Sequence, residues 1–539
     1  MSTTVAGEWS AGPPPHPPPP APVETQETIT TREFFAAAQS GALDRVTAMI
    51  DQKLVTATTV DAEGITALHW AAINNRHDIS EYLLKSGADI NAVGGQLVAP
   101  PLHWAARQGH LSMMALLVRY NANPHLLDRT NTSILHIGAQ FGFPLVVLYA
   151  ASLGVNVNGL DNDGRTALMW AVFKGFSEDA TRILLRFGAN VHIVDATGNS
   201  ALHWAAHQRH GASCDLLIKA GADVELKDAQ GSTASEIAGS KGAPTLIENA
   251  VEKAVDMRPE NTKRRNRAAY AVPFAAISAA LLALQHVSWY NGIVVIMMIF
   301  YACNVAIDVR RFSYVFMYHF VVLFLCFLFF FHSFPPFLTL FLLSQRVCKQ
   351  VSITTTPFFT GYFQASFMWV LILYFGHIMW ATSDWLLAHL LIAPTMLGTV
   401  YVCYLVILGD GGELPVCESD EQIAEQVRNL AAHNKLEARS FCMTCFIRRP
   451  LRSKHDRVFN KCYRRFDHYC PWVFNVIAGD NHRAFIAFLI TTVITEALFM
   501  AVAICCASPT PFSSVLTHCF RRAAPLEPRG RDQPVLLAQ

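Results

Sequence analysis

A short motif that returns every 33 or 34 residues constrains the fold of this chain more than any other feature. Its clearest copy reads Ala67-Leu68-His69-Trp70, and its leucine recurs in register as Leu68, Leu102, Leu135, Leu168 and Leu202. A unit of this length cannot bury its own apolar face, so successive units must stack to share a continuous core. The period therefore predicts a helical solenoid with a concave face.

The motif and its period resemble the ankyrin repeat. Each copy continues through a second apolar helix to a turn such as Gly87-Ala88-Asp89, and the weakest copies stand at the two ends. We expect about six repeats over residues 31–254. A concave ankyrin face can hold an extended peptide, and Asn74 with Trp104 is our candidate for that contact. The alternative is that the tryptophans pack between neighbouring inner helices.

Composition and hydropathy predict a membrane domain after the repeats. Hydrophobic residues make up 52% of the chain and charged residues 15%. A basic juxtamembrane linker, residues 255–267, precedes apolar stretches within residues 268–408, and another covers residues 484–507. The fold class is therefore all-α, a solenoid followed by a polytopic membrane domain. The net charge of +1 excludes a globally basic protein, so no nucleic-acid partner is expected.

Three segments have an unusual composition. Residues 1–30 are proline-rich and predicted to be disordered, and no signal peptide is visible, which places the start of the chain in the cytosol. Residues 321–343 form a Phe- and Leu-rich run broken by Pro335-Pro336. That run is either a re-entrant hairpin or a gene-model artefact. The tail, residues 508–539, is likewise either genuine or a misannotated end.

A polar segment, residues 409–483, gathers the residues capable of chemistry. Cys442 and Cys445 form a C-x2-C pair, followed by His455 and Cys462. Three thiolates and one imidazole are a common tetrahedral ligand set for structural zinc. The segment is therefore predicted to be a small cytosolic zinc-binding domain, on the reducing side of the membrane.

The run Asp467-His468-Tyr469-Cys470-Pro471-Trp472 follows. Together with Arg449-Pro450-x-Arg452-Ser453-x-His455, it resembles the cysteine-rich domain of DHHC-type palmitoyltransferases, in a branch that carries DHYC. The family binds two zinc ions, but the second ligand set is replaced here, and the resemblance therefore implies one zinc ion. The replacing residues are Asp456, Phe459, Tyr469 and Val476. The chain also departs from the family at Asp410-Gly411-Gly412, and it lacks a further helix and a Thr-Thr-x-Glu motif after the domain.

The resemblance implies a protein S-acyltransferase. Cys470 would take a fatty acyl group from palmitoyl-CoA and pass it to a substrate cysteine, with His468 as base and Asp467 orienting the imidazole. We expect a lowered pKa for the Cys470 thiol. A basic group would meet the phosphates of coenzyme A or, equally, anionic lipid. Its members are Arg448, Arg449, Arg452 and Lys454.

The expected partners are palmitoyl-CoA, membrane lipid and substrate proteins recruited by the repeats, in a multi-pass protein of the Golgi or associated vesicles. Two other interpretations use the same sequence. An ankyrin scaffold with a catalytically inert zinc module would have every one of these motifs but no catalytic activity. An ankyrin-bearing cation channel fails because the interval before its last helix, where a pore loop would lie, is occupied by the cysteine-rich segment.

Overall fold

The computed structural model describes residues 26–176, 178–256, 386–417 and 419–507, with a few isolated positions between 260 and 375. The chain forms two compact units. One contains residues 1–247 together with 419–436, and the other contains residues 248–418 together with 437–539. Each unit is described by itself.

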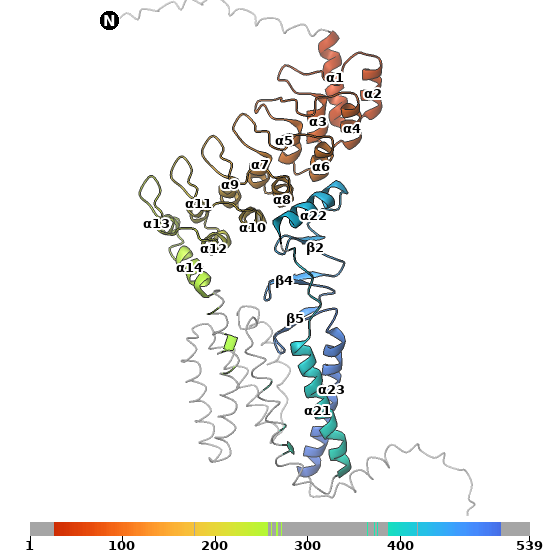
Figure 1. Cartoon of the computed structure of the whole chain (residues 1–539), viewed down its shortest axis with the longest axis vertical. Helices are drawn as coiled ribbons and strands as arrows, with labels where there is room; N and C mark the ends of the chain where they lie inside the picture. Colours follow the sequence, from red (N-terminus) through yellow and green to blue (C-terminus); the bar gives the residue numbers. More distant parts are fainter. Residues whose placement is uncertain are drawn as a thin grey trace, which may run out of the picture. The chain divides into compact units, whose positions relative to one another are not determined.

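The first unit is a stack of helices, which Figure 1 shows as a curved row from α1 to α13. Six helix pairs lie within residues 26–219 of this unit, and α13 (Ala234–Ser240) follows them. The next helix, α14 (Leu246–Asp256), begins at the boundary between the two units and lies mostly in the second. The six pairs are α1 (Gln26–Ser40) with α2 (Leu43–Asp51), α3 (Ala67–Ile73) with α4 (His77–Lys85), α5 (Pro101–Arg107) with α6 (Leu111–Arg119), α7 (Ile134–Phe141) with α8 (Pro144–Ser152), α9 (Ala167–Lys174) with α10 (Glu178–Arg186), and α11 (Ala201–Gln208) with α12 (Gly211–Lys219).

The repeated histidine explains why the inner helices begin where they do. At α3 the Thr66 hydroxyl accepts from the His69 backbone N–H, and the His69 ring returns a bond to the Thr66 backbone, which forms a capping box. The other ring nitrogen, Nε2, lies 3.0 Å from the carbonyl oxygen of Ala99 in the next repeat. His69 therefore caps its own helix and ties it to the next repeat, and His136 does the same at the start of α7.

An additional helix, α22 (Asp420–Ala432), belongs to this unit although it is distant from the repeats in sequence. It packs against α8 and α6 (Figure 1). The sequence assigned residues 409–483 to one domain, and the structure separates residues 419–436 from it. The physical reason is that Ile423 and Val427 on α22 are fully buried in contact with the stack.

In the second unit, α21 (Leu386–Leu408) and α23 (His482–Ala507) pack along each other. Between them lie three two-stranded antiparallel sheets. They are β1 (Phe441–Cys442) with β2 (Ile447–Arg448), β3 (Lys454–Asp456) with β4 (Lys461–Tyr463), and β5 (His468–Cys470) with β6 (Asn475–Ile477). The unit is therefore a helix pair that carries three small hairpins, so the fold is mostly helical and not strictly all-α.

One predicted membrane span can be examined directly. Among the described residues, length and apolar composition single out His389–Leu408 as a helix able to cross a membrane. The other spans predicted within residues 268–384, the run at 321–343 and the tail at 508–539 lie outside the described residues, as does nearly all of the N-terminal segment 1–30. The predicted helix at 484–507 is formed as α23.

Candidate active site and metal centre

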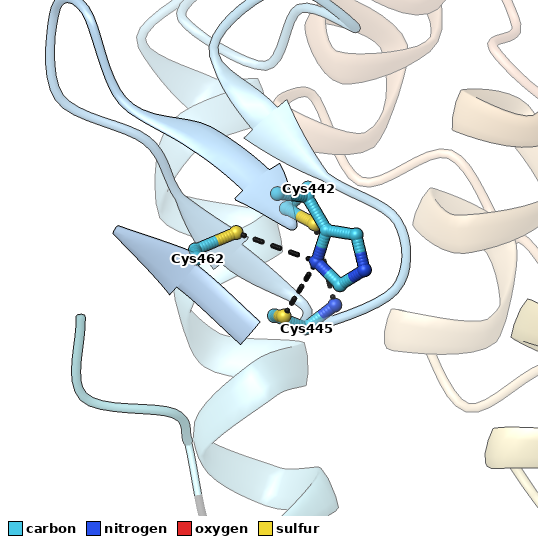
Figure 2. Close-up of side chains that lie close together, drawn as sticks. Cys442, Cys445 and Cys462 are labelled. Atoms are coloured by element: carbon cyan, nitrogen blue, oxygen red, sulfur yellow. Dashed lines mark hydrogen bonds between the residues drawn. The ribbon is translucent and has the colours of Figure 1, made fainter. Parts of the chain in front are cut away.

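The predicted zinc ligands come together at the first two hairpins. One ligand atom from each of Cys442, Cys445, His455 and Cys462 lies within 4.8 Å of the other three. Figure 2 shows the three cysteine sulfurs around an imidazole nitrogen. The His455 Nδ1 atom is 3.2 Å from the Cys445 Sγ atom and 3.7 Å from the Cys462 Sγ atom. The hairpin register explains this, because His455 pairs directly with Cys462.

The spacing and protonation of this set fit a divalent cation. Tetrahedral zinc with its usual bond lengths separates neighbouring sulfur and nitrogen ligands by roughly 3.5 Å. Hydrogen bonds from Cys445 and Cys462 lower the pKa of the Cys442 thiol, whereas contact with Cys442 raises the pKa of the Cys462 thiol. The three thiols therefore cannot all ionise together without a positive charge between them, and a metal ion supplies that charge.

An aromatic cluster occupies the place of the second ligand set. The rings of Phe459, Tyr469 and Phe474 meet edge to face, with centroids 5.5–6.3 Å apart. The Asp456 carboxylate accepts bonds from the Val458 and Phe459 backbone N–H groups, at 2.9 and 2.8 Å, and so holds the turn between β3 and β4. Apolar packing and a carboxylate cap thus stabilise this hairpin. The sequence did not indicate this aromatic cluster.

Cys470 lies at the end of β5 against the helix pair. Its side chain is 7% exposed and packs with Cys403 and Val406 of α21 and with Phe485 and Phe488 of α23. The neighbouring Trp472 is 43% exposed. The thiol is therefore placed at the boundary between the polar hairpins and the apolar helices.

This burial changes one expectation from the sequence. Desolvation raises the pKa of the Cys470 thiol, and backbone hydrogen bonds from Val473 and Trp472 offset that effect only in part. The expected lowering of the pKa is therefore wrong for this structure. The physical reason is that the apolar ends of α21 and α23 disfavour the thiolate more than the nearby N–H groups favour it.

Two imidazoles lie near the Asp467 carboxylate. The Asp467 Oδ2 atom is 3.1 Å from the His468 Nδ1 atom and 3.8 Å from the His482 Nδ1 atom. Because side chains alternate along a strand, His468 and Cys470 point to the same face of β5. The sequence placed His482 in the same polar segment but gave it no role, because only the fold brings the start of α23 beside Asp467.

Two asparagines fix the third hairpin to the helices. The Asn475 Nδ2 atom donates to the carbonyl oxygens of Val406 and Gly409, both at 2.8 Å, at the end of α21. Those carbonyls have no partner within the helix. The Asn481 side chain accepts from the Ala478 N–H and donates to the Val476 carbonyl oxygen. Cys470 therefore sits on a hairpin that is hydrogen-bonded to the end of α21.

Comparison with known proteins agrees with this geometry. The DHHC palmitoyltransferase family matches residues 435–521, and ankyrin repeats match residues 31–93, 100–129, 135–228 and 175–258. The chain is 32% identical over 478 residues to palmitoyltransferase ZDHHC17 of Danio rerio, with 86% of this chain and 70% of that protein covered. It is 33% identical to palmitoyltransferase Hip14 of Drosophila melanogaster, with 87% of this chain and 69% of that protein covered. It is 29% identical to palmitoyltransferase AKR1 of Saccharomyces cerevisiae, with 89% of this chain and 61% of that protein covered.

The chain belongs to the family of ankyrin-repeat DHHC palmitoyltransferases. Its activity is that of a protein S-palmitoyltransferase. The ankyrin solenoid and the cysteine-rich region with its metal-capable cluster are both features of this palmitoyltransferase.

The four basic residues predicted to meet coenzyme A have different surroundings. The Arg449 guanidinium donates to the Ala438 and Arg439 carbonyl oxygens at 3.2 and 2.9 Å, so it holds the chain before β1. Lys454 lies over the ring of Phe466, 5.2 Å from its centre. Arg448 and Arg452 are exposed. Arg449 is therefore engaged within the fold, whereas Lys454 is exposed like Arg448 and Arg452.

The predicted peptide contacts lie on the ankyrin unit of the palmitoyltransferase. Trp104 lines a groove of about 440 Å³ together with Ile65, Gly95, Arg107 and Asp128. The ring of Trp104 also contacts the rings of His69 and Trp70 edge to face, so part of it packs against the neighbouring inner helix. Asn74 ends α3, and its side-chain amide donates to the Trp70 carbonyl oxygen at 2.9 Å. Trp104 lines the groove, whereas Asn74 supports the helix next to it.

Proposed function

We propose that Cys470 carries the fatty acyl group as a thioester during palmitoyl transfer. The observation that supports this most directly is its position, with the sulfur packed among Val406, Phe485 and Phe488 at the ends of two apolar helices. An acyl chain bound to that sulfur would extend along apolar side chains, which favour it over water. The polar hairpin face would meet the coenzyme A portion of the donor.

In the first step the Cys470 sulfur attacks the thioester carbonyl of palmitoyl-CoA. His468 accepts the thiol proton as the new carbon–sulfur bond forms. The bond to coenzyme A then breaks, and the departing thiolate takes that proton from His468. Asp467 holds the His468 ring in the tautomer that leaves one ring nitrogen able to accept the Cys470 proton. Since burial raises the pKa of the Cys470 thiol, this proton transfer has to accompany attack.

In the second step a substrate cysteine attacks the Cys470 thioester. The palmitoyl group moves to the substrate sulfur, and Cys470 regains the proton that the substrate thiol gives up through His468. One thioester is exchanged for another, so no redox cofactor is needed. Burial of Cys470 also keeps water from the thioester between the two steps.

One zinc ion would be held by Cys442, Cys445, His455 and Cys462, and it would supply folding free energy and not reactive chemistry. Arg448 and Arg452 would meet the donor phosphates. We propose further that the chain is a multi-pass membrane protein of the Golgi or associated vesicles, and that the Trp104 groove recruits extended segments of substrate proteins.

Purified full-length protein in detergent, incubated with radiolabelled palmitoyl-CoA, tests the proposal. The wild type should take up label that hydroxylamine removes, and Cys470→Ser should take up none. Cys403→Ser is the matched control, because Cys403 lies in the same apolar cluster. His468→Ala should slow labelling by roughly 10²- to 10⁴-fold. A folded, zinc-containing wild type without label would favour the alternative of an inert zinc module.

A further inference from the structure

Two outer helices of the ankyrin unit carry more apolar surface than a solenoid needs. An outer helix normally buries one face and leaves the others to water, as α4 does with the sequence HDISEYLLK. In contrast, α8 has the sequence PLVVLYAAS, contains no charged residue and buries seven of its nine residues. Its neighbour α6 buries the five consecutive residues Met113–Leu117. The repeat architecture alone does not account for this burial.

The helix α22 covers these two outer helices. Ile423, Val427, Leu430 and Ala431 recur at the spacing of one helical face, and all four are buried. The Arg428 guanidinium donates to the Ser152 carbonyl oxygen, which ends α8 and has no partner within that helix. At the start of α22, the Asp420 carboxylate is 3.0 Å from the Arg186 guanidinium at the end of α10. Apolar and polar contacts therefore fix one register for α22.

Because α22 lies close to the cysteine-rich segment in sequence, its docking limits the distance between that segment and the outer helices. Residues 433–440 alone connect α22 to β1, the strand that carries the first zinc ligand, Cys442. A chain of that length spans roughly 30 Å at most. While α22 is docked, the cysteine-rich segment cannot move farther than this from the outer helices of the ankyrin unit.

We infer that α22 is an intramolecular docking helix that keeps the catalytic segment within reach of a substrate held by the ankyrin unit. This inference rests on the proposed function, because it concerns delivery to Cys470. Holding two sites together raises the effective concentration of one at the other without any new contact at either site. Release of α22 should therefore slow transfer to a substrate held by the ankyrin unit and leave the acylation of Cys470 itself unchanged.

A reporter within the full-length protein tests this without a known substrate. A flexible Gly/Ser insert of about 20 residues, with one cysteine at its middle, is placed after the exposed Gln96, beside the groove. Val427→Asp puts a charge on the docked face, and Asn429→Asp adds the same charge on the exposed face as the matched control. Arg428→Glu is a milder second variant at an exposed position. Mass spectrometry measures palmitoyl on the insert cysteine and on Cys470, with Cys470→Ser giving the uncatalysed background.

Val427→Asp should lower palmitoyl transfer to the insert cysteine by about tenfold or more relative to Asn429→Asp. The two variants should carry equal amounts of palmitoyl on Cys470 and equal amounts of zinc. Arg428→Glu should give a smaller loss. Hydrogen exchange in α22 and α8 should rise together in Val427→Asp. Equal transfer in Val427→Asp and Asn429→Asp, an equal fall at both cysteines, or unchanged exchange in α8 would overturn the inference. Absence of label on wild-type Cys470 would instead contradict the proposed function, and exchange would still decide whether α22 docks.

Discussion

At the scale of single residues, the Cys470 thiol and its neighbours have opposite environments. Cys470 is enclosed by apolar side chains, whereas Asp467 and His468 are close to half exposed. The sulfur is thus shielded, while His468, its proposed proton acceptor, stays in contact with water. Reactivity would then come from proton transfer during attack and not from a thiolate present beforehand.

The raised pKa of the Cys470 thiol has a measurable consequence. A thiol alkylates as its thiolate, so the rate of iodoacetamide labelling at Cys470 should still be climbing as the pH passes 9, the ordinary value for this group. The wild type in detergent, with peptide mapping, gives this rate at Cys470 alone. A rate that reaches its plateau near pH 7 would show that the thiolate is already stabilised in the resting protein.

At the scale of elements, each hairpin is stabilised by a different means. Zinc ligands gather on the first two hairpins, and an aromatic cluster with the Asp456 cap lies where the second ligand set would be. The third hairpin is hydrogen-bonded through Asn475 to α21. Three inner ankyrin helices, α3, α7 and α11, begin with capping boxes that use a buried histidine.

We predict one zinc ion per chain. Cys445→Ser should lose both the metal and the acylation activity, because structural zinc contributes on the order of 10 kcal/mol to folding. Restoring the second set, with Asp456→Cys, Phe459→Cys, Tyr469→His and Val476→Cys together, should raise the content to two. Metal analysis of the purified protein counts the ions. Two ions in the wild type would show that the aromatic cluster does not exclude a second site.

The buried histidines predict that the ankyrin unit weakens in acid. Burial lowers the pKa of His69 and of His103 to about 4, below the ordinary 6.5, so the unfolded chain binds protons that the folded chain does not. Stability should be fully present above pH 6.5 and should fall as the pH drops from 6.5 to 4, by on the order of 3 kcal/mol for each histidine.

Urea unfolding of the full chain, followed by circular dichroism between pH 7 and pH 4.5, measures this loss. His69→Asn removes one titrating group, so its stability should depend less steeply on pH than that of the wild type. If the free energy of unfolding depends equally steeply on pH in the two proteins, His69 binds protons equally in the folded and the unfolded state.

At the scale of the whole molecule, the groove proposed for recruitment and the cysteine proposed for chemistry belong to different units. The groove with Trp104 lies on the ankyrin unit, and Cys470 lies on the other. We therefore expect Trp104→Ala to weaken substrate acylation several-fold and to leave the labelling of Cys470 intact. Trp170→Ala is the matched control, because Trp170 lies in another repeat and donates to Asp161. Loss of both activities in Trp104→Ala would show that the ring serves packing alone.

The sequence predicted much of this arrangement, and its errors have physical causes. Leucine spacing located the solenoid, and the C-x2-C pair with His455 and Cys462 located the metal cluster, because both patterns are local. The docking of α22 was missed because its partners, α6 and α8, lie about 300 residues earlier in the chain. His482 was given no role because only the fold brings it beside Asp467. The pKa of the Cys470 thiol was wrongly predicted because it depends on helices that the motif does not contain.

The most direct test of the account is the position of the acyl group on the enzyme. Full-length protein is incubated briefly with palmitoyl-CoA, quenched in acid and digested, and each cysteine peptide is weighed with and without hydroxylamine. We predict a hydroxylamine-sensitive palmitoyl group on the peptide that contains Cys470, and its accumulation when no substrate protein is present. A palmitoyl group on other cysteines while Cys470 stays unmodified in folded, zinc-bound protein would contradict the account.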